Sequence, residues 1–259
     1  MQSVSVVFLG TCACDFSPKL KTEYKDVFDP DARRSASMLL DGSILVDCGP
    51  HTLDALRIGG IDPSSVTDLL LTHLHDDHFV PENVALLAAS REIPLRLWVR
   101  EDAELSPIPH TVIRRMKPYT RYEAEGGFAV TGLLANHDGD AHPQHFLLER
   151  AGKKIFYGCD GAWLLAPTYY HLRNAHLDLA VFDCTMGDYT GDYRIGEHNG
   201  IPMLRLLLPS LRGFGTLDEH TKVYFSHLAP SLHKPHAETE AIAREMGAHV
   251  AHDGLRITV

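Results

Sequence analysis

The stretch Thr72-His73-Leu74-His75-Asp76-Asp77-His78 follows an apolar run, residues 66–72, that predicts a buried strand. Alternation along an extended segment places His73 and His75 on the same side of the chain. Asp77 and His78 follow where a turn can direct them toward a second centre. Imidazole and carboxylate groups at this spacing suit zinc, manganese or iron. The sequence therefore predicts a divalent-metal site at the end of this strand.

Further metal-competent side chains are expected at the ends of later strands, because a motif this short cannot enclose two ions. Each candidate follows an apolar run that predicts a strand, and the candidates are His137, Asp160 and His227. One such residue alone would be an ordinary surface or structural residue. Their shared position after predicted strands favours a common site.

The rest of the chain predicts strands in both halves, separated by helices. Predicted strands lie at 3–9, 36–40, 43–47, 66–72, 95–99, 128–135, 145–149, 154–158, 177–183, 222–226 and 255–259, and predicted helices at 81–91, 200–212 and 235–246. A polar loop is expected at 15–34. This order favours a mixed α/β sandwich over a parallel barrel, and we expect one domain spanning residues 1–259.

Composition narrows the function classes. The 259 residues carry a formal net charge of −10, from 24 Lys and Arg against 34 Asp and Glu. An acidic total disfavours broad binding to nucleic-acid polymers, and no apolar run reaches the roughly 18 residues of a membrane span. Five scattered cysteines indicate no disulfide framework and favour a reducing compartment. We therefore expect a cytoplasmic protein without a membrane partner.

The motif His73, His75, Asp77 and His78 resembles the H-x-H-x-D-H signature of the metallo-β-lactamase superfamily. The resemblance extends from the first predicted strand to His227. It implies a four-layer αββα sandwich with two divalent ions at one edge, zinc or manganese above all, with iron also suitable. The ligands that it implies are His73, His75 and His137 for one ion, Asp77, His78 and His227 for the other, and Asp160 as a bridge.

His78 indicates the branch of the superfamily to which the chain is similar. Broad-spectrum lactamases have Arg at this position and use a downstream Cys, and no cysteine of this chain stands at that place. Asp183 follows a predicted strand, and His198 lies thirteen residues beyond Thr185. This pattern, together with Gly10-Thr11 and Arg33-Arg34, resembles the ribonuclease Z and PhnP-type phosphodiesterases.

The resemblance implies hydrolysis of a small phosphodiester, cyclic substrates included, by a hydroxide that bridges the two metals. Two metals stabilise the charge on phosphorus and lower the pKa of a shared water. His198 would be the general acid, worth roughly 10²–10⁴-fold, with Asp183 as its orienting partner and Asp77 also among the catalytic residues.

Other polar residues stay open. PhnP-type enzymes carry a Cys-rich zinc site, whereas Cys12 and Cys14 have no two further ligands nearby in the sequence. The two cysteines are therefore interpreted as reduced, structural thiols. Arg33 or Arg34 could bind a substrate phosphate, although solvated loop charges are favoured. His142, His145 and His233 are candidates for lining the substrate pocket. Trp98 and Trp163 are expected to have a packing role.

Two alternative functions remain beside the phosphodiesterase. The same metals could hydrolyse a carboxylic ester, lactone or thioester without a need for His198. A non-catalytic metal-binding accessory or carrier protein would also retain the ligands. The expected partner is a small anionic substrate, and the sequence leaves a homodimer, the native substrate and the physiological metal open.

Overall fold

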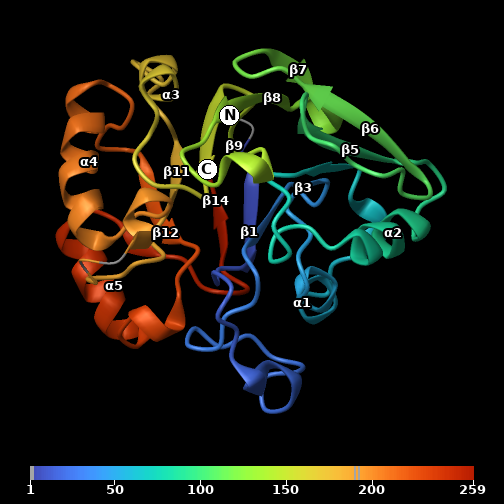
Figure 1. Ribbon diagram of the computed structural model, residues 1–259, viewed down its shortest axis with the longest axis horizontal. Helices are drawn as coiled ribbons and strands as arrows, with labels where there is room; N and C mark the ends of the chain where they lie inside the picture. The colour runs from blue at the N-terminus through green and yellow to red at the C-terminus, as the bar shows by residue number, and fades with distance from the viewer. Residues whose placement is uncertain (1–2, 190, 192) are drawn as a thin grey trace.

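Two mixed β-sheets form the centre of the molecule (Figure 1), whose computed structural model describes residues 3–189, 191 and 193–259. The first sheet has the order β14-β1-β2-β3-β4-β5-β6, and the second β13-β12-β11-β10-β9-β8-β7. Their strands are Ser5–Gly10 (β1), Ser37–Leu40 (β2), Ile44–Val46 (β3), Asp68–Leu70 (β4), Leu95–Arg100 (β5), Thr111–Met116 (β6), Arg121–Glu123 (β7), Ala129–Leu134 (β8), Gln144–Arg150 (β9), Lys153–Gly158 (β10), Leu179–Asp183 (β11), Lys222–Ser226 (β12), His249–Val250 (β13) and Arg256–Thr258 (β14).

Helices cover the outer face of each sheet (Figure 1). They are Thr52–Ile58 (α1) and Pro81–Ala89 (α2) on the first sheet, and Ala166–His171 (α3), Ile201–Gly213 (α4) and His236–Glu245 (α5) on the second. Alternation along β1 shows the layering, because Val6 and Phe8 join the core between the sheets whereas Val7 and Leu9 join the core under α1 and α2. The predicted αββα sandwich is confirmed.

Every element expected from the sequence is present, with bounds that differ by at most two residues. The Asp41-Gly42 turn between β2 and β3 has positive φ at both residues, 45° and 70°. The sequence missed β6, β7, β13, α1 and α3. Strand β6 lies at a sheet edge with most of its side chains exposed or half-exposed, so it shows no apolar alternation. The two missed helices have seven and six residues, too few for a clear helical period.

The expectation that Arg33 and Arg34 are solvated loop charges is wrong, because both are buried. Arg33 Nη1 donates to Thr11 Oγ1 and to the Ala251 carbonyl, each at 2.6 Å. The Arg34 backbone N–H donates to Asp253 Oδ2 at 2.7 Å. These bonds join the start of the chain to its C-terminal segment, so the two arginines hold the fold together.

No described helix is long and apolar enough to cross a membrane. All five cysteines are free thiols, and Cys14 alone among them is exposed. Burial raises the pKa of Cys48 to about 12, so this thiol is inert at neutral pH.

Strand β4, which leads into the histidine motif, is anchored by the fully buried Asp68. Its carboxylate accepts hydrogen bonds from Arg96 Nε at 2.7 Å, from Arg96 Nη2 at 2.6 Å and from Trp98 Nε1 at 2.6 Å. Trp98 is thus a hydrogen-bond donor as well as a packing residue. These bonds tie β4 to the neighbouring strand β5.

Asp68→Ala should lower the free energy of unfolding by roughly 3–5 kcal/mol, because it leaves the partly buried Arg96 guanidinium and the Trp98 N–H unpaired. Urea denaturation measures the loss. The control is Asp26→Ala, which breaks an exposed pair with Arg57 and should cost far less. Equal losses in the two variants would refute the anchoring role.

Candidate metal centre

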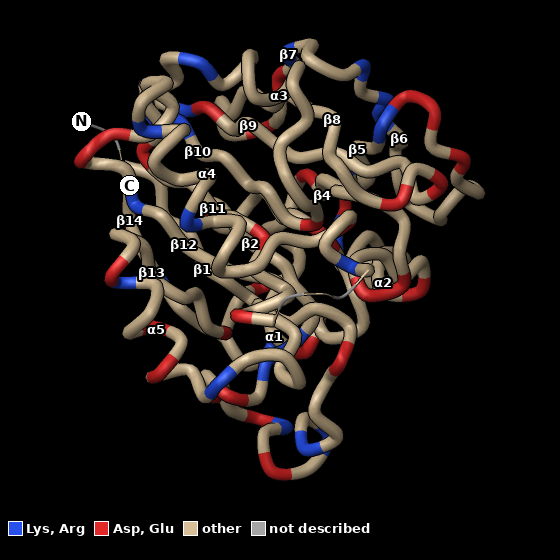
Figure 2. Tube along the Cα trace, turned by 60° about the vertical axis from the view of Figure 1, so that its left-hand side comes forward, with Lys and Arg blue, Asp and Glu red and all other residues tan. Residues whose placement is uncertain are grey.

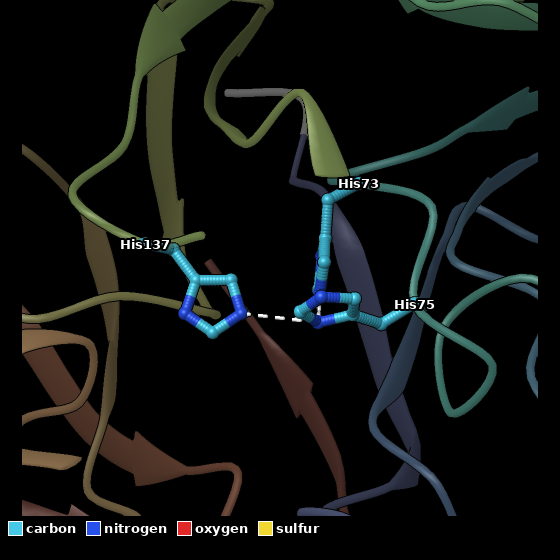
Figure 3. Close-up of side chains that lie close together, drawn as sticks. All are labelled: His73, His75 and His137. Carbon is cyan, nitrogen blue, oxygen red and sulfur yellow. Dashed lines mark hydrogen bonds between the residues drawn. The ribbon is translucent and has the colours of Figure 1, made fainter. Parts of the chain in front are cut away.

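Three histidines from two loops converge at one edge of the sandwich. His73 and His75 follow β4, and His137 follows β8. Their rings point toward one another in Figure 3. His75 Nδ1 lies 3.1 Å from His73 Nε2 and 3.2 Å from His137 Nε2. The predicted first set of ligands is therefore brought together.

The second predicted set also meets at this edge. Asp77 and His78 lie in the turn after the first two histidines, and His227 follows β12 in the other sheet. His78 Nε2 is 3.0 Å from His227 Nε2, and Asp77 Oδ2 lies 3.4 Å and 3.6 Å from these two nitrogens. Although burial raises it, the pKa of Asp77 is lowered overall by His78 and His227.

Asp160, which follows β10, lies between the two sets. Its Oδ2 is 3.6 Å from His137 Nε2 and 3.9 Å from His73 Nε2 on one side. On the other side it is 3.3 Å from His227 Nε2 and 3.8 Å from His78 Nε2. Burial raises the pKa of this carboxyl, but His227 and His198 outweigh burial and hold it well below its usual range. One buried carboxylate thus faces both groups of imidazoles.

An oxygen atom holds the outward nitrogen of each imidazole. The pairs are His73 Nδ1 with Thr72 Oγ1 (2.9 Å), His75 Nε2 with Asp138 Oδ2 (3.3 Å), His78 Nδ1 with Asp47 Oδ2 (2.8 Å), His137 Nδ1 with the Glu197 carbonyl (3.2 Å) and His227 Nδ1 with Thr185 Oγ1 (2.8 Å). Such contacts orient each ring and leave the inward nitrogen as the electron-pair donor that a metal requires.

The spacing of the inward nitrogens fits a shared cation. Two nitrogens bound to one zinc ion at about 2.0–2.1 Å in tetrahedral geometry lie roughly 3.3–3.4 Å apart. The separations of 3.1 Å and 3.2 Å around His75 Nδ1 are close to this value. Imidazole nitrogens with one carboxylate shared between two sets are donors that divalent transition metals accept. The residues present therefore fit divalent metal ions.

His198, which the sequence suggests as a proton donor, lies beside Asp160. Its Nδ1 is 2.7 Å from Asp160 Oδ1 and 3.1 Å from Asp183 Oδ2. Burial lowers the pKa of His198, but Asp160 and Asp183 outweigh burial and raise it to about 10. Asp183 also lies 3.2 Å from His227 Nδ1, so it contacts a predicted ligand as well as His198.

Other predicted residues lie elsewhere. His145 is buried behind the site, 3.3 Å from the Asp160 carbonyl, and burial lowers its pKa to about 4. His142 contacts Asp102 at the surface, and His233 Nε2 donates to the Cys184 carbonyl at 2.6 Å. None of these histidines belongs to a described group able to hold a metal, nor do Cys12 and Cys14. Trp163 is 39% exposed, so packing does not account for it.

Sequence reasoning missed two carboxylates that hold the rings. Asp47 follows β3, which pairs in parallel with β4, so its position at a strand end was a usable signal. Its carboxylate also accepts from the Thr72 backbone N–H at 2.8 Å. Asp138 directly follows His137 in the sequence, but nothing in that spacing points to His75.

Comparisons with known proteins agree with this geometry. The family model described as "Metallo-beta-lactamase superfamily" matches residues 31–161. The metallo-β-lactamase fold protein YhfI from Bacillus subtilis superposes with a TM-score of 0.75 at 15% identity over 100% of both chains. A diphosphatase from the PhnP family superposes with a TM-score of 0.72 at 19% identity, over 98% of this chain and 97% of that one.

A curated relative, ribonuclease Z of Mycolicibacterium gilvum (strain PYR-GCK), is 27% identical over an alignment of 144 positions that covers 51% of this chain. The chain spans less than half of that relative, 45% of its length. The likeness to the PhnP-type and ribonuclease Z branch inferred from the sequence is thus found again in these relatives. With the family match over half of the chain, the histidine motif and the sandwich, the chain belongs to the metallo-β-lactamase superfamily.

Proposed function

We propose that this metal-dependent hydrolase is a dinuclear phosphodiesterase acting on a small anionic substrate, cyclic diesters included. The observation that carries the proposal is the contact of His198 Nδ1 with Asp160 and Asp183 beside the two histidine sets. A phosphodiester needs both charge neutralisation at phosphorus and a proton for the leaving oxygen. This edge of the sandwich offers groups suited to each task.

The ligand sets would be His73, His75 and His137 for one ion and Asp77, His78 and His227 for the other, with Asp160 shared. Two divalent ions bound there would lower the pKa of a water molecule and neutralise the phosphate charge. Asp183 accepts a hydrogen bond from His198 Nδ1 and fixes the ring, which leaves Nε2 to protonate the leaving oxygen. Burial lowers the pKa of His198, whereas Asp160 and Asp183 raise it, and a raised pKa favours the protonated ring that a general acid requires.

The substrate and location follow from the same features. The formal charge of −10 disfavours a nucleic-acid polymer as substrate, whereas a small phosphate anion can reach a locally positive metal centre. The free thiols of all five cysteines support a reducing compartment, so we place the protein in the cytoplasm.

Protein purified without chelator and then supplied with zinc or manganese should bind two ions per chain and hydrolyse bis(p-nitrophenyl) phosphate. Elemental analysis and p-nitrophenolate release measure the two results, and a chelator should abolish hydrolysis reversibly. A stoichiometry that stays near one would refute the dinuclear centre. Full loading with hydrolysis of a lactone or thioester, and of no diester, would replace the phosphodiesterase by the carboxylic-ester alternative.

A further inference from the structure

A cavity of about 510 Å³ lies beside the histidine motif, between the start of α2 and the loop that joins β5 to β6. This apolar pocket is lined mostly by apolar residues, among them Leu74, Phe79, Ala85, Leu105 and Ile108. Leu74 stands between two histidines of the first predicted ligand set, so the pocket begins at the loop that forms the metal centre. The proposed mechanism uses none of these side chains.

The walls of the apolar pocket are held in place. Leu105 and Ile108 pack against the core under α1 and α2. Strand β6 binds the loop that carries them at two points. Arg115 Nη1 donates to the Ala103 carbonyl at 2.6 Å, and Thr111 Oγ1 donates to the Ile108 carbonyl at 2.9 Å. A pocket that is formed before binding loses little free energy to the ordering of its own side chains.

The apolar pocket continues toward the metal centre. A neighbouring hollow of about 550 Å³ shares Asp76 and Phe79 with it and also reaches the predicted ligand Asp77. Neither lining includes His198 or Asp183, which are the proton donor and its partner in the proposed reaction. A diester bound at the metals can therefore place one ester group in the pocket, while the group that leaves lies at His198.

The charged residues of the pocket lining are all acidic, namely Asp76, Glu82 and Glu104. Figure 2 shows acidic residues along the loop after β5 and beside α2. Glu82 lies in the first turn of α2, where the helix end counters its charge. Glu104 is exposed on the loop, and none of the described lysines, arginines or histidines forms an ion pair with it. The loop side of the pocket therefore repels an anionic group and accepts an uncharged one.

We propose that the apolar pocket binds an uncharged alkyl or aryl group of the substrate, the ester group that stays on phosphorus. This inference rests on the proposed phosphodiesterase function and deepens it, because it names the substrate class as a small diester with one apolar ester group. Burial of apolar surface favours binding, and the volume of the pocket lies in the range of small-molecule sites, roughly 300–1,000 Å³. A polynucleotide is disfavoured, because a further phosphate in the pocket would meet Glu104.

Binding of 1-hexanol tests the pocket without turnover. In ¹H–¹³C spectra of isoleucine-labelled protein, 1-hexanol should shift the Ile108 methyl signal of the wild type. Ala85→Phe fills the pocket from α2 and should abolish this response. The control is Ala89→Phe, at the exposed last residue of the same helix and outside the lining, which should keep the response. No shift in the wild type, or the same shift in Ala85→Phe, overturns the inference.

Turnover of hexyl and methyl p-nitrophenyl phosphate supplies the second readout, because the two diesters share one leaving group. The wild type should prefer the hexyl ester in kcat/KM by about 10²-fold, since each added methylene contributes up to about 4-fold when it is buried. This preference should fall roughly 10-fold or more in Ala85→Phe and stay unchanged in Ala89→Phe. A wild type without the preference, or Ala85→Phe with all of it, overturns the inference while the phosphodiesterase stands. If 1-hexanol shifts Ile108 but neither diester is cleaved, the pocket stands and the proposed function fails.

A carboxylate at the end of the alkyl chain tests the preference for an uncharged group. The wild type should cleave 5-carboxypentyl p-nitrophenyl phosphate with a lower kcat/KM than the hexyl ester. Glu104→Gln should raise the ratio of the carboxylated to the hexyl ester by about 3-fold or more, because it removes a like charge from the pocket. The control Glu101→Gln, an exposed residue of the same loop outside the lining, should leave the ratio unchanged. Equal cleavage of the two esters by the wild type overturns this preference.

Discussion

Asp160→Asn should empty both halves of the metal centre and lower kcat/KM for a diester by more than about 10²-fold. Loss of a residue that holds a ligand already costs 10–100-fold, and Asp160 faces both histidine sets directly. A neutral amide offers one oxygen where the carboxylate offers two charged ones, so it bridges two cations poorly. Elemental analysis and steady-state kinetics measure the two losses.

The matched control is Asp138→Asn. Asp138 is half-exposed and contacts His75 Nε2 at 3.3 Å, so its loss should weaken one metal set and cost about 10-fold. If Asp160→Asn keeps two ions per chain, the shared role of this carboxylate is refuted.

His198→Ala should lower kcat/KM by roughly 10²-fold or more for alkyl or ribose diesters and far less for bis(p-nitrophenyl) phosphate. An alkoxide needs a proton as the P–O bond breaks, whereas p-nitrophenolate is already stable as an anion. The metal content should stay at the wild-type value. Asp183→Asn should show a weaker dependence on the leaving group, because the ring loses its 3.1 Å partner but not its proton.

Other outcomes would assign His198 a different role. Its proximity to Asp160 and His227 also makes it a candidate metal ligand. In that case metal occupancy would fall and both substrates would suffer together. Equal losses with full occupancy would indicate substrate positioning and remove the proton-donor role.

The sequence predicts the histidine motif and the later ligands for a physical reason. Residues that follow parallel strands meet at one edge of a sheet, and the ends of β10, β11 and β12 bring Asp160 and His227 close to Asp183. The pattern of apolar residues along the strands also predicts the sandwich, because a strand that is apolar on one face or on both indicates which of its faces are buried. Both signals are local patterns in the sequence, so they can be recognised without knowing the fold.

The rest depends on contacts that no local pattern encodes. Arg34 is buried because Asp253, 219 residues later, comes back to meet it. His75 is held by Asp138 across 63 residues, and His78 by Asp47 across 31. An arginine in a polar loop looks solvated until the partner from the other end of the chain is placed.

The position of the histidines at the edge between the two sheets has a consequence for the stability of the protein. His73 and His78 belong to the first sheet's loops, whereas His137 and His227 come from the second. Ions held there would join the halves of the sandwich and stabilise the closed form, by about 2.7 kcal/mol at a free concentration 100 times the Kd. Metal supply would then set how often this edge opens, and with it how quickly the chain is degraded when metal is scarce.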